Sequence, residues 1–193
     1  IASVLFGFTY VKDSILRNDN LILLETKNWV TTEYGAPGIT IETPEVLTRK
    51  LLDLNFTYLN SNNISEFAFY NNDNSMQIYV SNTRFNDKIK PEDFQKYIDY
   101  TLDIIEAKGL RNIVVKYENF TTANEAEGIK VYGSADFIDP NSGKIISGKY
   151  SILGFFTENE FKQLIIIHED DIYLNEITDN VISSVELIKN QQQ

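Results

Sequence analysis

The strongest constraint on the fold is a long run of alternating apolar and polar residues between positions 111 and 168. Successive side chains of a β-strand point to opposite faces of a sheet, so this alternation predicts strands. Clusters of turn-forming residues divide the run and favour tight antiparallel connections. We therefore expect a meander of four consecutive strands, at 111–120, 128–138, 144–157 and 160–168.

Two segments change to the spacing of an amphipathic helix. In 91–108, apolar residues recur at i, i+3 and i+4, Pro91 stands early, and Gly109 follows the end. Residues 175–189 show the same spacing. We expect both helices to pack on one sheet through their apolar stripes. The residues expected to be buried are Phe94, Ile98, Leu102, Ile105, Val181 and Val185.

The first half of the chain has weaker signals. Alternation at 38–42 predicts a strand, and residues 64–85 are typical of a hairpin whose turn is Asn71-Asn72-Asp73-Asn74. Between them, Thr43 and Pro44 have the order of an N-cap followed by the first helical position, which predicts a short helix. Its apolar side would be Val46, Leu47, Leu51 and Leu54.

A mostly antiparallel sheet with segregated helices is an α+β sandwich. Four segments also follow a family pattern: GITIETPEV, MQIYV with KPEDFQKYIDYTLDIIEAKG, GKYSILGFF and EITDNVISSVEL. Over residues 34–189 their order resembles the PsbP-like fold, which includes the PsbP subunit of photosystem II, a Ran-binding nuclear-transport factor and DcrB-like envelope lipoproteins. The resemblance implies a PsbP-like sandwich with no common catalytic residue, and it departs from the family's Ser-Phe ending at Ser184-Val185.

We divide the chain into an apolar segment, 1–16, and a single domain, 17–193. Read as a helix, the first segment is apolar on every side, and its run before Lys12, apolar except for Ser3 and Thr9, is shorter than the roughly 20 residues that cross a bilayer. One interpretation makes it the end of a membrane anchor, with Tyr10 and Lys12 at the interface. The other makes it part of the core.

Charge and composition exclude several classes of protein. The chain has 17 Lys and Arg against 28 Asp and Glu, a formal net charge of −11. Such a protein has no general attraction for phosphate backbones, so we expect no nucleic-acid partner. There is no Cys and only one His, which excludes disulfides and thiolate chemistry.

The single His stands beside acids, in the order His168, Glu169, Asp170, Asp171. One interpretation is a divalent metal site or a general base held by an acid. Adjacent strand residues point to opposite faces, however, so a solvated turn after the strand is favoured. The oxygen-rich stretches Asn71–Asn74 and Asp136–Ser142 lack the calcium-loop pattern, and we interpret both as Asx turns.

Other residues invite a functional interpretation without completing a motif. Ser183, Ser184 and the Gly133-Ser134 pair are not part of a G-x-S-x-G elbow. No phosphate-binding glycine motif occurs in the sequence. Asp99, Asp103 and Glu106 lie on the polar side of the 91–108 helix, as exposed charges do. Most aromatic residues are expected in the core, although some could form a wet edge of the sheet: Tyr34, Tyr70, Tyr79 and Tyr132.

From these observations we expect a non-enzymatic binding or accessory domain that acts on a protein partner or membrane complex. No catalytic, cofactor-binding or metal-binding residue is assigned. The expected location is exported and membrane-associated, in a bacterial envelope, with an organelle membrane complex as the alternative. The competing function is a carrier that holds a small apolar ligand between the sheet and its helices.

Overall fold

A computed structural model describes residues 21, 24–25, 29–35, 38–51, 67–70, 76–85, 87–107, 109–138 and 143–188. The apolar segment 1–16 and the predicted turn Asn71–Asn74 lie outside the described residues. The described part has an α+β fold built on antiparallel sheets, as the sequence predicts.

Most strands belong to a seven-stranded sheet with the order β3-β4-β5-β9-β8-β7-β6. Every neighbouring pair is antiparallel. The four-strand meander is confirmed in β6 to β9, and the predicted hairpin is confirmed in β4 and β5. The bounds are β3 Thr48–Leu51, β4 Phe67–Tyr70, β5 Met76–Arg84, β6 Lys116–Thr121, β7 Glu127–Ile138, β8 Ile145–Phe156 and β9 Glu160–Glu169.

A second sheet, which the sequence analysis did not predict, has three strands in the order β1-β2-β10. These are β1 Val30–Gly35, β2 Gly38–Thr43 and β10 Glu186–Leu187. Ile39 and Ile41 of β2 join the same buried cluster as Ile78 and Ile166 of the large sheet. The expectation of one sheet was wrong because the small sheet covers apolar surface that a single helix leaves open.

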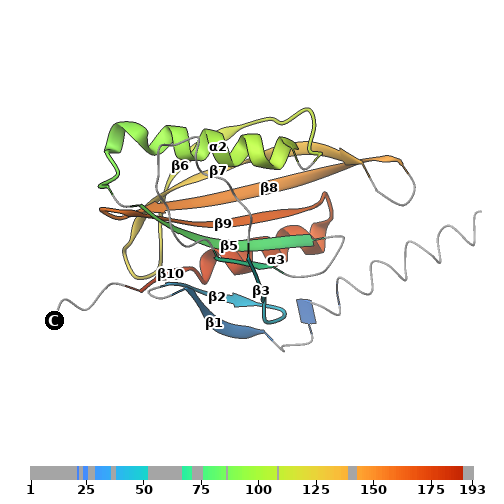
Figure 1. Ribbon diagram of the computed structural model, residues 1–193. Coiled ribbons are helices and arrows are strands. Elements are labelled where there is room, and N and C mark those ends of the chain that lie inside the picture. Colours follow the sequence, from blue (N-terminus) through green and yellow to red (C-terminus); the bar gives the residue numbers. More distant parts are fainter. Residues whose placement is uncertain are drawn as a thin grey trace, which may run out of the picture.

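The two helices lie on opposite faces of the large sheet (Figure 1). Helix α2, Phe94–Ala107, follows the 3-10 turn η2, Pro91–Asp93, and confirms the first predicted helix. It comes close to the sheet at Gly154, where an added Cβ would stand 2.9 Å from Ile98 Cδ1. Helix α3, Ile172–Ser183, shares the other face with the small sheet.

The predicted helix 175–189 is displaced in the structure. Asp171 caps α3 by accepting hydrogen bonds from the Tyr173 and Leu174 amides at 2.9 and 3.2 Å, so the helix begins three residues earlier than predicted. It ends at Ser183, and Glu186 and Leu187 pair with β2. The apolar spacing correctly predicted a helix at α3, but the same spacing continues by chance into β10, which is a strand.

The short helix predicted at Thr43 does not form. Thr43 is the last residue of β2, and its hydroxyl donates to the Glu45 carbonyl oxygen instead of accepting from an amide. Leu47 is buried, and its amide donates to the Tyr34 hydroxyl at 2.9 Å. This bond fixes the turn that leads into β3. Thr43 and Pro44, which predicted the start of a helix, therefore stand at the start of a turn. Leu54 lies outside the described residues.

Burial agrees with four of the six residues named from the sequence. Ile98, Ile105, Val181 and Val185 are buried, whereas Phe94 and Leu102 are only half-buried. Thr101 is buried in α2 and donates a hydrogen bond to Gln163 Oε1 on β9 at 2.9 Å. Helix α2 is therefore rotated so that a hydrogen-bonded threonine, and not Leu102, faces the sheet.

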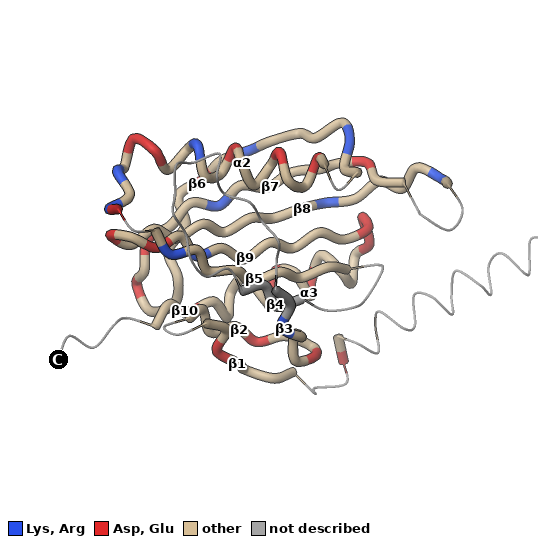
Figure 2. Tube along the Cα trace, viewed as in Figure 1, with Lys and Arg blue, Asp and Glu red and all other residues tan. Residues whose placement is uncertain are grey.

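Acidic positions are spread over α2 and the connecting loops (Figure 2). Asp99, Asp103 and Glu106 are exposed, which confirms that they belong to the polar face of the helix. Within the described residues, no helix is both long and apolar enough to cross a bilayer.

Candidate functional site

A cluster of charged side chains lies on the face of the large sheet that the small sheet covers. Arg84 on β5 stands directly opposite Glu160 on β9, and its Nε and Nη2 donate to Glu160 Oε1 at 2.8 and 2.5 Å. Two residues along β9, Lys162 Nζ lies 3.4 Å from Glu160 Oε2. The Glu160 and Lys162 side chains are only 5% and 3% exposed, whereas the Arg84 side chain is 50% exposed. The buried centre of the cluster is therefore the Glu160–Lys162 pair.

The ammonium group of Lys162 is poorly compensated. It has three donors, and Glu160 supplies its only ion pair or hydrogen bond with a described residue. Asn82, directly opposite Lys162 on β5, has its Oδ1 buried without a hydrogen-bond partner. Among the residues that the structure describes, two cations share one carboxylate here, which leaves one positive charge in excess. Buried charges ordinarily have full pairing, because taking an ion out of water is costly.

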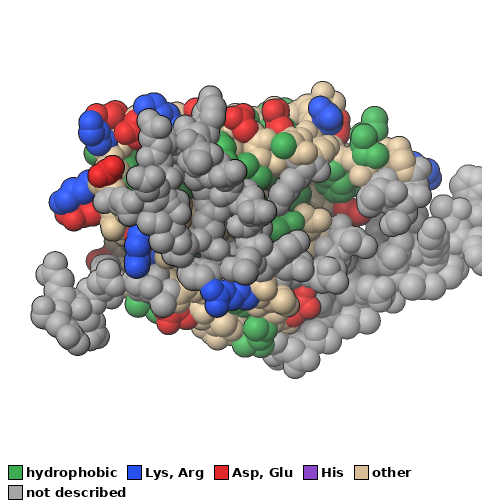
Figure 3. Space-filling view, in the orientation of Figure 1, with side chains coloured by type: hydrophobic (Ala, Val, Ile, Leu, Met, Phe, Trp, Pro, Cys, Tyr) green, Lys and Arg blue, Asp and Glu red, His purple; other side chains and the backbone are tan. Residues whose placement is uncertain are grey.

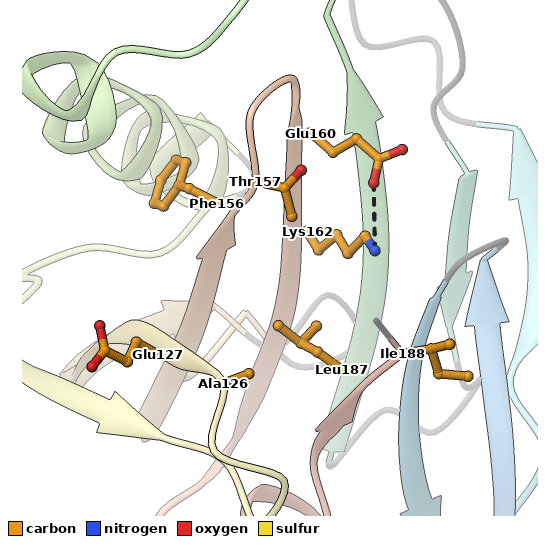
Figure 4. Close-up of a pocket in the computed structure, with 8 residues that line it drawn as sticks. All are labelled: Ala126, Glu127, Phe156, Thr157, Glu160, Lys162, Leu187 and Ile188. Carbon is orange, nitrogen blue, oxygen red and sulfur yellow. Dashed lines mark ion pairs between the residues drawn. The ribbon is translucent and has the colours of Figure 1, made fainter. Parts of the chain in front are cut away.

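This cluster opens into a cleft of about 390 Å³ at the end of the large sheet (Figure 4). Charged side chains of β9 line one side, and Leu187 and Ile188 line another. Glu127 also lines the cleft, but its carboxylate is directed away from Lys162 in Figure 4. The other lining residues are Ala126, Phe156 and Thr157. The cleft thus has the surplus positive charge beside Glu160 and Lys162 on one side, and an apolar wall formed by Leu187 and Ile188 on another.

The apolar wall is held in place by the turn before β7. Asn124 Nδ2 donates to the Leu187 carbonyl oxygen at 2.7 Å, and the Leu187 amide donates back to Asn124 Oδ1 at 3.3 Å. Thr122 supports this arrangement by donating from Oγ1 to Asn124 Oδ1 at 2.7 Å. Leu187 also belongs to β10, which pairs with β2. The cleft wall is therefore fixed by two separate parts of the chain.

His168 lies elsewhere, in a groove of about 400 Å³ between α3 and strands β7 and β8. The residue is 3% exposed, and its Nδ1 lies 2.7 Å from the Glu169 carbonyl oxygen. A carbonyl can only accept, so Nδ1 carries the proton and Nε2 is an acceptor in the neutral ring. Burial lowers the pKa of His168, which favours this neutral form. Thr178, on the α3 side of the groove, has a buried hydroxyl without a hydrogen-bond partner.

The two aspartates that follow His168 have structural partners. Lys149 binds Asp170 at 2.7 Å and holds the pKa of that carboxyl below its usual range. Asp171 caps α3. Among the residues that the structure describes, no three His, Asp or Glu side chains are grouped so as to hold a metal ion.

The other candidate residues are dispersed. Ser183 and Ser184 donate to carbonyl oxygens of α3, as helix-end serines do. Tyr34 is buried, Tyr132 lines the His168 groove, and the side chain of Tyr70 lies outside the described part. Asp136 accepts from Asn112 Nδ2 at 2.8 Å, while positions 139–142 of its stretch are not described. The structure does not bring these residues together in one site.

The Glu160–Lys162 pair was not predicted, although the sequence of β9 contains a signal for it. Positions 160 and 162 have the same parity as Leu164 and Ile166, which are fully buried. Side chains at alternate positions share a face of the sheet, and both faces of β9 are buried, so an apolar strand in the interior carries two charges on one of its faces. A search for opposite charges at i and i+2 within an apolar strand would have found them.

Comparisons with known proteins give little. No protein-family model matches the chain, and no curated protein matches it. The chain is similar to a crystal structure from Bacteroides thetaiotaomicron VPI-5482, with a TM-score of 0.42 and 12% identity, covering 86% of this chain and 50% of that one. It therefore spans half the length of that neighbour, and so distant a likeness supports no functional argument. The comparisons do not test the PsbP-like resemblance, which stays a prediction.

Proposed function

We propose that the chain is a non-enzymatic binding domain whose cleft beside β10 takes a small ligand with one carboxylate and an apolar body. The observation that carries the proposal is Lys162, a buried ammonium that lines an open cleft and whose one ion pair with a described residue has a distance of 3.4 Å. A ligand carboxylate would supply the missing acceptors, and charge-assisted hydrogen bonds to an ammonium are among the stronger polar contacts.

The charges of the site favour an anion over a cation. Glu160 is already engaged by Arg84 and Lys162, so it has little capacity to attract a third cation. An anion would instead balance the surplus positive charge, and low-dielectric walls strengthen that attraction. The chain as a whole carries −11. A local positive site would therefore select ligands that the rest of the surface repels.

The apolar wall limits the rest of the ligand. Leu187 and Ile188 offer aliphatic surface, and Ile188 is 37% exposed. The Phe156 ring is directed toward α2 in Figure 4, and it stacks on Phe94 at 3.9 Å between centroids. An aliphatic tail on the ligand would pack on the wall that β10 supplies. The volume of the cleft is in the range of small-molecule sites.

Calorimetric titration with hexanoate, and with hexanol as a matched probe, tests the proposal. Both probes have the same tail, but only hexanoate carries a charge. We expect hexanoate to bind and hexanol to bind at least about 10-fold more weakly, since a hydrogen bond to a charged group contributes roughly 1.5–3 kcal/mol. Equal binding of the two probes would show that Lys162 does not recognise the anion.

The matched variants are Lys162→Met and Lys88→Met. Lys162→Met keeps an unbranched side chain and removes the charge, and it should abolish the preference for hexanoate. Lys88 pairs with Glu158 on the surface, where both side chains are at least 75% exposed, so its variant should bind as the parent does. Retention of hexanoate binding in Lys162→Met would refute the assignment of the site.

A second proposal, that the chain acts on a protein partner, has its own observation. The β7–β8 hairpin projects beyond the rest of the sheet, and hydrophobic side chains are visible at its end (Figures 1 and 3). Ile138 and Ile145 pair across it and are 56% and 73% exposed. Exposed apolar groups of this kind are typical of interaction sites.

Photo-cross-linking in cells tests this second proposal. A photo-reactive phenylalanine analogue at position 145 should give one discrete heteromeric product, whereas the same analogue at position 88 should give none. Equal labelling from the two positions would argue against a partner at the hairpin.

A further inference from the structure

Among the described strands, β6 leaves one edge of the seven-stranded sheet open. It is the last strand in the sheet order, and no described strand pairs with its outer side. Val114, Val115 and Tyr117 are 51%, 37% and 49% exposed. An edge of this kind presents free backbone donors and acceptors, and it is a ready template for another strand.

The register shows which residues direct their backbone groups outward. The Val114 amide donates to the Ser134 carbonyl oxygen at 2.9 Å, and the same register pairs Lys116 with Tyr132. In an antiparallel pair, alternate residues direct their N–H and C=O groups at the partner strand. The backbone N–H and C=O groups of the even positions 114 to 120 are thus directed at β7, and those of Val115, Tyr117 and Asn119 are directed outward.

The side chains along this edge are complementary to themselves. Lys116 and Glu118 flank Tyr117, so two copies placed antiparallel about Tyr117 bring each Lys116 opposite the Glu118 of the other copy. The same arrangement places Val114 opposite Phe120. Opposed residues in such pairs lie roughly 4.5–5.5 Å apart at Cβ, close enough for oppositely charged side chains to interact. Because of the two-fold axis, every cross-strand pair occurs twice except the Tyr117 pair, which lies on the axis.

The charges within one chain are consistent with this pairing. Lys116 makes no ion pair with any described residue, and its Nζ lies 5.9 Å from the centroid of the Tyr132 ring. Glu118 binds Lys130 at 2.9 Å, and its side chain is still 43% exposed. A second copy would give Lys116 the carboxylate that it lacks.

We propose that β6 pairs with β6 of a second copy of this chain, with Tyr117 on the two-fold axis, to form one continuous sheet. A second copy fits better than an unrelated strand because the order Lys116-Tyr117-Glu118 has opposite charges at its two ends, which antiparallel self-pairing matches without any further requirement. This proposal concerns a different surface from the ligand cleft and does not depend on it.

Charge variants test the dimer by sedimentation velocity over a wide dilution series. Lys116→Glu keeps the Glu118–Lys130 ion pair and places a second carboxylate opposite Glu118 of the other copy, so dimerisation should be weakened at least about 10-fold. The double variant Lys116→Glu with Glu118→Lys restores opposite charges and should dimerise again. Lys88→Glu is the matched control for total charge, and it should behave as the parent does.

A proline variant tests the backbone pairing independently. In Asn119→Pro, the lost amide is one that faces outward, so the β6–β7 ladder keeps its hydrogen bonds while the outer edge loses a donor. We expect a folded monomer, with an unchanged circular dichroism spectrum. A parent chain that is monomeric at every concentration overturns the proposal. So does a dimer that is unaffected by both Lys116→Glu and Asn119→Pro.

Discussion

The Glu160–Lys162 pair leads to an unequal stability effect for its two members. In Glu160→Gln, Lys162 loses the one ion pair that it makes with a described residue, and its side chain is only 3% exposed in the parent. Removing one partner of a buried pair typically costs about 3–5 kcal/mol. Arg84 adds little to this cost, because its side chain is 50% exposed and can return to water. For a domain of this size the loss corresponds to a drop in Tm of roughly 6–20 °C.

Lys162→Met should behave differently. Glu160 keeps two hydrogen bonds from Arg84, at 2.8 and 2.5 Å, so no unpaired charge is created. Methionine fills irregular space well, and replacing buried ions by apolar groups is often neutral or stabilising. We expect the free energy of unfolding to stay within about 1 kcal/mol of the parent value or to rise.

Urea unfolding followed by circular dichroism measures both effects. The double variant Glu160→Gln with Lys162→Met should be more stable than Glu160→Gln alone, because Lys162→Met removes the ammonium group that Glu160→Gln leaves without its ion pair. Lys88→Met and Glu158→Gln, at the exposed pair, should each change stability by less than about 1 kcal/mol. If Lys162→Met destabilised as much as Glu160→Gln, Lys162 would be a fully paired structural residue, and the argument for an open binding site would fail.

Three further predictions concern other parts of the chain. Burial lowers the pKa of His168 below its ordinary value of 6.5, so the unfolded chain binds a proton more readily than the folded chain, and stability should fall as the pH drops below about 6.5. In urea titrations, the free energy of unfolding of a His168→Gln variant should depend less steeply on pH, and the same pH dependence in variant and parent would contradict this. Asp171→Ala removes the cap of α3 and should lower the free energy of unfolding by about 0.5–2 kcal/mol, with Asp171→Asn close to the parent as the capping control. Deleting residues 1–12 should release the chain from membranes with an unchanged melting curve, if that segment is an anchor; a lower Tm without prior membrane association would place it in the core.

Regular patterns made the meander predictable. Strands β6 to β9 follow one another in both sequence and space, so alternation and turns were sufficient to order them. The position of β5 between β4 and β9 depends on contacts far apart in the chain, which local periodicity does not contain. The same limit explains why β10 was read as helix: Glu186 and Leu187 have no local strand pattern and become extended because β2 offers them hydrogen bonds.

The candidate cleft was not predictable as a whole, although its parts were visible. Glu160 and Lys162 stand in a predicted strand, and both faces of that strand are buried. The surplus positive charge exists only because β5, about eighty positions earlier in the chain, places Arg84 opposite Glu160. The same strand places Asn82 opposite Lys162. His168 attracted notice because it is the only His, yet its Nδ1 is engaged by the backbone of its own neighbour.

Strand β10 has a consequence for the order of folding. Its partner residues are Thr40 for Glu186 and Ile39 for Leu187, so the small sheet joins positions 146 residues or more apart. Pairings of such high contact order form slowly, because a long loop must close before they give any stabilisation. During synthesis, β5 to β9 can assemble while the chain is still growing, but the wall made by Leu187 and Ile188 cannot exist until residue 188 has left the ribosome. Ligand capture would then require β10 to be in place, since a chain that has not yet formed this strand has the charged floor of the cleft without its apolar wall.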